Sequence, residues 1–249
     1  MGRHILERHI RDARADDLDA LKAAQIHFAK QVITQDQFSD HKTVAGVDVA
    51  YRGERYCAAI RVLGRHDLTE VEALDVVGQV TGQDIGQITG KGAFPYVSGL
   101  LAYREMPAVL DVFEQMGALP DIVIFDGNGH LHPRQCGAAR YLGLVLDIPV
   151  IGVSKNPPFR DYTASFELKR GNFEPLSGSD IGPNIGPDIG QGLALCTQDK
   201  VKPIFVSIGH KVSLDTAKDI VMELSRYRVP EPIRVADQAC RQGLRRDVC

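Results

Sequence analysis

Residues 121–154 read DIVIFDGNGHLHPRQCGAARYLGLVLDIPVIGVS, and this stretch decides the fold class. Its two apolar runs, 121–125 and 150–154, have the length of buried strands, and residues 137–147 between them have the pattern of a helix. A strand, a helix and a second strand in this order predict a crossover that leaves the two strands parallel. A further helix is expected at residues 98–116. The stretch therefore predicts an α/β sheet with parallel pairing.

The chain before this stretch predicts one helix and an antiparallel meander. Residues 15–33 place apolar side chains at helix-compatible positions. Three β-rich runs follow at residues 43–51, 56–63 and 71–80, and short turns that contain glycine, arginine and aspartate separate them. Turns of this length join antiparallel neighbours, so the three runs predict a three-stranded meander.

The chain after this stretch adds two strands and two helices. The strands are expected near residues 193–196 and 204–207, one helix at 213–228, and a basic helix at 235–247. Three antiparallel strands, then alternating helices and strands, then a further helix are the order of the ribonuclease H-like fold. Other mixed α/β sheets share parts of this order, so the fold alone does not assign a function.

Length and composition predict one domain without a membrane segment. The chain has 249 residues, 44% of them apolar, which is enough for one sizeable core. We expect a single catalytic domain over 1–249, with the N-terminal helix at about 15–33, the core at about 43–228 and a basic segment at about 229–249. No stretch approaches the roughly 20 consecutive apolar residues that a membrane span needs, and no signal peptide is evident, so a cytoplasmic protein is expected. A monomer is the default expectation for its oligomeric state.

The net charge and the cysteine content limit the kinds of binding site and cross-link that the chain can form. The net charge of −3 creates no global basic field, so binding to phosphate must come from local arginines and lysines. The five cysteines are scattered without a Cys-x-x-Cys pair, which favours reduced thiols over a disulfide framework or a zinc site. Residues 180–190, DIGPNIGPDIG, repeat Ile-Gly between prolines and predict an ordered surface loop rather than a mobile linker.

Two aspartates stand in or after apolar strands. Asp48 lies inside the apolar run at 44–50, where an ionised carboxylate needs a compensating cation, backbone amides or an arginine. Asp126 ends the strand at 121–125 and opens a Gly-Asn-Gly turn, where ligands often bind in parallel sheets. If the first and fourth strands are neighbours, the two carboxylates converge and form a hard-oxygen site suited to Mg²⁺.

Glu105 is a third candidate acid. It lies on a partly apolar face of the helix at 98–116, just ahead of Pro107, which is expected to break or restart that helix. A carboxylate held at a kink can point into a cleft. The alternative is an ordinary exposed glutamate near a helix N-terminus.

Cationic and imidazole side chains follow the same strands. His132 and Arg134 come after Asp126 and are interpreted as donors that position a nucleic-acid backbone, rather than as metal ligands. Lys155 follows the strand at 150–154 and could stabilise charge on a phosphate, although a solvated lysine is equally plausible there. His210 also follows a strand and could hold the water or the phosphate, although a loop histidine usually does neither.

Four blocks in order resemble the endonuclease V family, from about residue 44 to about residue 228. They are VAGVDVA at 44–50, FPYVSGLLAYRE at 94–105, PDIVIFDGNGHLHPR at 120–134 with IGVSK at 151–155, and PIFVSIGHK at 203–211. The resemblance implies a ribonuclease H-like fold. It also implies metal-binding carboxylates at Asp48 and Asp126, and a catalytic glutamate at Glu105, which would serve as a third metal ligand or orient the water.

The resemblance further implies assisting and recognition residues. Lys155 and His210 would assist at the phosphate, and His132 with Arg134 would line the groove. A lesion-recognising wedge, normally Pro-Tyr-Ile-Pro in the family, appears in this chain as Pro95-Tyr-Val-Ser98, so Tyr96 would open the strand with Pro95 beside it. Ser98 departs from the family's second proline. Backbone amides at 82–92 and at Gly127 and Gly129 are expected to read the flipped base, because glycine lets main chain approach closely.

The implied function is a metal-dependent endonuclease acting at deaminated purines, hypoxanthine or inosine, in DNA repair. In the family the cut falls at the second phosphodiester bond 3′ to the lesion and leaves a 3′-hydroxyl and a 5′-phosphate. Mg²⁺ is the expected cofactor, with Mn²⁺ as a substitute. The expected partner is DNA with deoxyinosine, and inosine-containing RNA is the alternative, because the sequence does not decide between the two sugars.

Two interpretations from other classes stay open at this point. A phosphotransferase or ATPase with an Asp-Gly-x-Gly phosphate loop would explain residues 126–129, and the absence of a Gly-x-x-x-x-Gly-Lys-Ser/Thr run removes only its P-loop version. A lesion-binding module without catalysis would keep Tyr96 and lose the acids. All three acids are present, so this last interpretation ranks lowest.

Overall fold

A single mixed sheet forms the centre of the protein. The computed structural model describes residues 13, 17–38, 41–79, 94–157, 162–176 and 192–245, so the repeat at 180–190 and the glycines expected at 82–92 lie outside the described residues. Within these ranges, eight strands are ordered β3-β2-β1-β4-β5-β8-β7-β6. Their bounds are β1 Thr43–Arg52, β2 Arg55–Gly64, β3 Glu70–Gln79, β4 Ile122–Asp126, β5 Val150–Ser154, β6 Phe173–Pro175, β7 Gly192–Leu195 and β8 Ile204–His210.

The pairing follows the predicted pattern. β1, β2 and β3 form an antiparallel meander, and β4 and β5 join β1 in parallel. β8 then pairs antiparallel with β5, and β7 and β6 continue in the antiparallel sense. The strand order and directions confirm the expected ribonuclease H-like fold.

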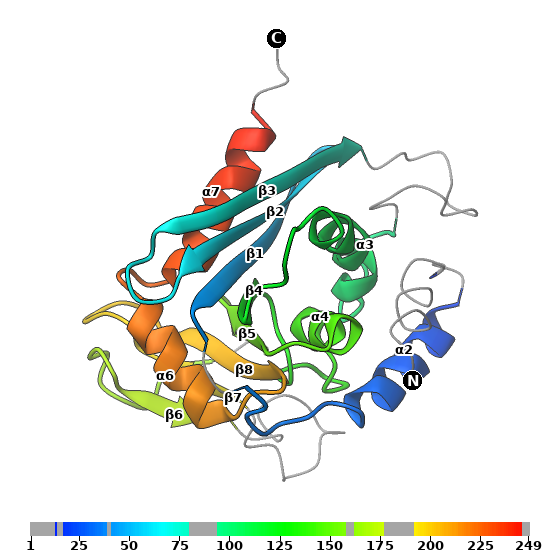
Figure 1. Ribbon diagram of the computed structural model, residues 1–249. Helices are drawn as coiled ribbons and strands as arrows, with labels where there is room; N and C mark the ends of the chain where they lie inside the picture. The colour runs from blue at the N-terminus through cyan, green and yellow to red at the C-terminus, as the bar shows by residue number, and fades with distance from the viewer. Residues whose placement is uncertain are drawn as a thin grey trace.

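Helices cover both faces of the sheet (Figure 1). On one face lie α2 Leu18–Ala29, α3 Leu101–Phe113 and α4 Ala138–Leu146, which share one apolar core with the odd-numbered residues of β1. On the other face lie α6 Leu214–Leu224 and α7 Glu231–Gly243, which cover β4, β5, β8, the even-numbered side of β1 and the odd-numbered side of β2. This division decides which side chains meet at the edge of the sheet.

Three helix predictions need correction. The helix expected to break at Pro107 runs through it, because the neighbouring side chains Met106, Ala108 and Val109 are fully buried and their packing offsets the roughly 3 kcal/mol that an interior proline costs. The helix expected to end at residue 228 ends at Leu224. Ser225 there adopts an extended conformation, and its hydroxyl donates back to the carbonyl of residue 221.

The C-terminal helix begins four residues earlier than predicted. It starts at Glu231 rather than at residue 235, and Pro232 occupies its first turn. A proline is tolerated there because the first backbone N–H groups of a helix have no intrahelical acceptor. The basic run thus forms only the second half of α7. No helix formed by the described residues is long and apolar enough to cross a membrane.

Candidate active site

Asp48 and Asp126 meet at one edge of the sheet. β1 pairs in parallel with β4, and the register sets Val47 opposite Phe125, so the next residues along the two strands are neighbours. Asp48 is only 8% exposed. Burial, together with the negative charges of Asp126 and Asp237, raises the pKa of Asp48 to about 7 against the opposing effect of Lys155. Two carboxylates so placed repel each other and favour a bound cation.

Glu105 reaches the same place from α3. Its side chain is 8% exposed although it lies on a helix, because α3 packs its apolar face onto the sheet. Burial raises the pKa of Glu105 well above its ordinary value, and the charges of Asp48 and Asp126 raise it further. The three acids that the sequence singled out therefore act on one another electrostatically.

Lys155 supplies a positive charge at this edge. Its Nζ donates to Asp126 Oδ2 at 2.7 Å and lies 3.8 Å from Asp237 Oδ1. Burial lowers the pKa of Lys155, but the neighbouring Asp126 and Asp237 more than reverse this, so the pKa is raised and the side chain stays charged. The end of β5 thus brings an ammonium group beside the carboxylates, as the sequence predicted.

Asp237 is the residue that sequence reasoning missed. It lies on α7, ion-pairs with Arg241 at 2.9 Å, and is one of the charges that raise the pKa of Asp48. α7 reaches this position because Gly46 lets its first turn touch β1: a Cβ on Gly46 would lie 1.9 Å from the carbonyl oxygen of Pro232. The sequence did contain a signal for it. Asp237 stands four residues before Arg241, at the spacing of a helical ion pair, in a segment that was interpreted only as a basic helix.

The thiol of Cys240 adds a second tie between α7 and β1. Its Sγ lies 3.3 Å from the carbonyl oxygen of Asp48 and 3.2 Å from that of Cys57, and it hydrogen-bonds to both. The four described cysteines are free and buried. The backbone of the strand that carries Asp48 is therefore held from the α7 side.

His132 and Arg134 form hydrogen bonds inside the protein, so their predicted contact with nucleic acid stays a prediction. Arg134 donates from Nη2 to the carbonyl of Gly99 at 2.7 Å and from Nε to Oε1 of Gln25 at 2.5 Å. His132 Nε2 lies 3.0 Å from the same Gly99 oxygen. Burial lowers the pKa of His132 to about 4, so the ring is neutral at pH 7. Both side chains therefore hold the segment 94–100, which precedes α3, through its residue Gly99.

That segment presents Pro95 and Tyr96 to solvent. Tyr96 is 72% exposed, whereas Phe94 and Leu100 at the two ends of the segment are buried. Gly99 has a φ of +77°, which glycine adopts without strain, and the turn it makes aims its carbonyl at Arg134. An exposed ring on a segment anchored at both ends fits the predicted wedge.

Gly127 and Gly129 do not offer free amides, which corrects their predicted role in reading a base. The amide of Gly127 donates to the carbonyl of Val153 at 2.8 Å, and that of Gly129 donates to Ser207 Oγ at 2.9 Å. A Cβ on Gly129 would lie 2.3 Å from the carbonyl oxygen of Ile208. These glycines let the loop after β4 pack against β5 and β8.

His210 lies at the opposite end of the sheet from Lys155, so the structure does not bring it to the acids as the sequence led us to expect. β8 runs antiparallel to β5, and His210 pairs with Val150 at the start of β5, whereas Lys155 follows the end of β5. Its Nδ1 accepts from the amide of Ile33 at 3.2 Å, and its Nε2 lies 3.4 Å from Asp147. Burial lowers the pKa of His210. These contacts give the ring a structural role.

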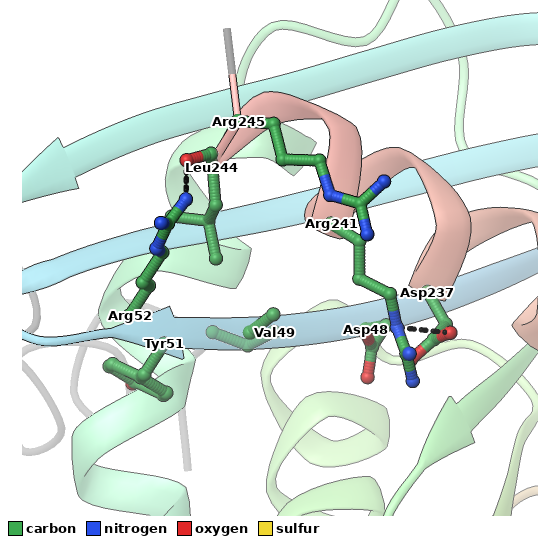
Figure 2. A pocket seen from close by; sticks show the side chains of 9 residues that line it. Asp48, Val49, Tyr51, Arg52, Asp237, Arg241, Leu244 and Arg245 are labelled. Carbon is green, nitrogen blue, oxygen red and sulfur yellow. Dashed lines mark hydrogen bonds and ion pairs between the residues drawn. The ribbon is translucent and has the colours of Figure 1, made fainter. Parts of the chain in front are cut away.

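A groove opens beside the acids (Figure 2). Its volume is about 610 Å³, and it runs between the end of β1 and the second half of α7. Its lining residues are Asp48, Val49, Ala50, Tyr51, Arg52, Asp237, Arg241, Leu244 and Arg245. Carboxylates therefore stand at one end of the groove, and the remaining lining contains three arginines among apolar side chains and Tyr51.

A ribonuclease H-like sheet with a buried carboxylate on β1, a partly buried one on β4 and a lysine after β5 defines a phosphodiester hydrolase of the nuclease class. The family model described as Endonuclease V matches residues 26–238. Endonuclease V of Roseiflexus castenholzii is 40% identical over 91% of this chain and 93% of its own length, and that of Streptomyces avermitilis is 42% identical over 81% and 80%. The chain belongs to the endonuclease V family.

Solved structures agree with this assignment. The crystal structure of Streptomyces avermitilis endonuclease V is 36% identical with a TM-score of 0.77, and the match covers 93% of this chain and 94% of that one. The catalytic domain of human endonuclease V is 30% identical with a TM-score of 0.79, covering 95% and 99%. Ciona intestinalis endonuclease V, 27% identical with a TM-score of 0.74 over 93% and 98%, was crystallised with a 24mer DNA containing an inosine followed by a ribo-adenosine.

Proposed function

We propose that this protein cuts nucleic acid at hypoxanthine, the deaminated purine base, in DNA repair. It hydrolyses the second phosphodiester bond 3′ to the lesion and leaves a 3′-hydroxyl and a 5′-phosphate. The observation that carries the proposal is the group formed by the buried acids Asp48 and Glu105 and the partly buried Asp126 beside Lys155. The Ciona relative in complex with inosine-containing DNA supports the choice of lesion.

Mg²⁺ is the proposed cofactor, with Mn²⁺ as a substitute. Among the described residues, no three His, Cys, Asp or Glu side chains are grouped so that they could hold one metal ion. The pair Asp48 and Asp126 nevertheless fits, because Mg²⁺ is usually bound by one or two carboxylates, with waters and substrate phosphate oxygens in the other positions. Glu105 remains a proposed ligand or water-orienting group. When bound, the ion would neutralise charge on the scissile phosphate.

The protein's own groups account for the proton and charge movements. A water molecule forms the new O–P bond, and the Glu105 carboxylate orients it and accepts its proton, for which a raised pKa suits a base. The bond from phosphorus to the 3′-oxygen breaks, and that oxygen takes a proton from solvent water to become the 3′-hydroxyl. Lys155 Nζ, charged beside Asp126, stabilises the negative charge that develops on the phosphate.

Lesion recognition is assigned to the exposed segment before α3. Tyr96, with Pro95 beside it, enters the base stack and offsets part of the few kcal/mol that flipping a base costs. His132 and Arg134 act as positioning residues through Gly99. We further propose that the protein acts as a cytoplasmic monomer.

Cleavage of end-labelled strands tests this function. DNA and RNA strands, each with or without one hypoxanthine, are incubated in Mg²⁺ with the wild type, Asp126→Asn and the control Asp215→Asn. Asp215 is a matched aspartate whose side chain is 94% exposed on α6. We expect a cut one nucleotide beyond the lesion, lost in Asp126→Asn and kept in Asp215→Asn, and the two sugars show which nucleic acid is preferred. A wild type that cuts neither hypoxanthine strand refutes the proposal.

No observation favours the ATPase alternative. Its phosphate loop at residues 126–129 needs amides that face a ligand, but those of Gly127 and Gly129 donate to β5 and β8.

A further inference from the structure

The groove between β1 and α7 begins at Asp48, one of the acids of the proposed active site, and leads away from it. The pairing of β1 with β4 stops at Val47, whereas β1 continues to Arg52. From Asp48 to Arg52 the strand advances about 13 Å at roughly 3.3 Å per residue. α7 lies along this extension, so an elongated hollow leads away from the acids (Figure 2).

Three arginines line this hollow. Arg52 donates to the carbonyl of Leu244 at 3.4 Å, which holds its side chain along the groove. Arg241 pairs with Asp237, yet its side chain is 65% exposed. Arg52 and Arg245 are exposed as well. In Figure 2, Arg241 extends toward Asp48, and Arg245 projects from the last turn beside it. Three guanidinium groups in one groove suit phosphate, because guanidinium matches its geometry with paired donors.

The overall charge of the protein makes this groove important. At a net charge of −3, the chain as a whole repels a polyanion, so binding must come from a local concentration of positive charge. The acids at the scissile bond increase that repulsion. A groove that carries three arginines and opens directly from Asp48 supplies the opposing charge where a strand has to pass.

The two faces of the sheet set the direction of the strand. The segment with Tyr96 belongs to the α3 face, since Phe94 and Leu100 pack in the core between α3 and the sheet. The arginines of the groove stand on the α7 side, since Arg241 lies on α7, Arg245 follows it and Arg52 is an even-numbered residue of β1, and the acids lie where the two faces meet. A strand held at its lesion by Tyr96 therefore meets the acids next and the groove last.

We propose that Arg52, Arg241 and Arg245 bind the backbone phosphates of the strand on the 3′ side of the cut. This inference rests on the proposed function, because the cut lies 3′ to the lesion. Binding by phosphate contacts holds the leaving 3′ product segment in register without reading its sequence.

Salt dependence of binding tests the groove. Strands carrying one hypoxanthine are titrated against the protein in the non-cleaving Asp126→Asn background at several salt concentrations. Arg52→Gln with Arg245→Gln removes two arginines that do not pair with the site acids. The control Arg65→Gln removes an arginine that pairs with Glu223 at the far end of the meander. For two lost phosphate contacts, we expect the slope of log affinity against log salt to fall by about 1.4, and the control to leave it unchanged.

Two further measurements test whether these arginines bind phosphates on the 3′ side of the cut. Arg52→Lys with Arg245→Lys should restore most of the slope, which a purely structural role for the arginines would not predict. A strand shortened on the 3′ side of the cut should bind the protein with the intact groove and the Gln variant with equal affinity. A strand shortened on the 5′ side should still bind the Gln variant more weakly. An unchanged slope, or a difference lost only by 5′ shortening, overturns the inference.

Failure of the inference and failure of the proposed function are distinguishable. If the wild type cuts hypoxanthine strands but the arginine variants bind like it, the groove assignment alone is wrong. If the wild type cuts no hypoxanthine strand, the proposed function is wrong, whatever the salt dependence.

Discussion

Replacing Gly46 by alanine tests whether the contact between β1 and α7 positions the active site. The new Cβ would lie 1.9 Å from the carbonyl oxygen of Pro232, and ordinary contact begins at 3.4 Å, so the backbones must separate by about 1.5 Å. Overpacking of this kind typically costs about 1–3 kcal/mol of the free energy of unfolding. Because Asp237 is carried on α7, we also expect cleavage to fall on the order of 100-fold, the effect typical of a misplacement near 1 Å.

Urea denaturation and single-turnover cleavage measure the two effects separately. Gly117→Ala is the matched control, because a Cβ at Gly117 meets no atom within 4 Å. Cleavage is measured where each variant is fully folded, so that a stability loss cannot imitate an activity loss. A Gly46→Ala protein that unfolds at the wild-type urea concentration and cuts at the wild-type rate would refute the reasoning.

Three other predictions concern titration and side-chain roles. Because the folded-state pKa of Asp48 is raised from 3.8 to about 7, the folded protein keeps a proton that the unfolded chain has lost. The metal-free protein should therefore lose stability as pH rises from about 4 to about 7, and Asp48→Asn should flatten this decline in a urea series. Glu105→Gln should lower cleavage by about 100-fold or more yet raise the melting temperature of the metal-free protein, since the cost of burying an ionisable carboxyl is removed; a lower melting temperature would contradict this. His210→Ala should cost about 1–3 kcal/mol of unfolding free energy, because the amide of Ile33 loses its acceptor, while the folded variant cuts within about twofold of wild type; a large loss of cleavage would restore its catalytic assignment.

The sequence predicted the sheet and its acids because those signals are local. The apolar run before Asp126 has the length and composition of a buried strand. An aspartate inside the apolar run at 44–50 is costly to bury, so its presence indicated a functional carboxylate. The parallel crossover then made neighbours of the two acids. The sequence also grouped Glu105 with these acids, but for the wrong reason. A kink at Pro107 was expected to direct the carboxylate into a cleft, whereas α3 continues through Pro107.

The errors arise from information that the sequence carries only through the folded chain. His210 follows a strand just as Lys155 does, but β8 runs against β5, and strand direction cannot be deduced from the end of a single strand. Asp237 was missed because its place depends on α7 touching Gly46, a contact between distant segments. The donors of Arg134 were expected to face a ligand, yet Gly99 and Gln25 use them.

The tie from Cys240 to the backbone of Asp48 joins residues 192 positions apart. A ribosome delivers the chain from its N-terminus, and β1 to β5 are synthesised long before α7. A nascent chain can assemble the meander and bring Asp48 beside Asp126 while the helix that supports that strand and completes the arginine groove is still missing. We therefore expect the competence to cut nucleic acid to be acquired late in synthesis, and a chain truncated before α7 to show no cleavage of hypoxanthine strands.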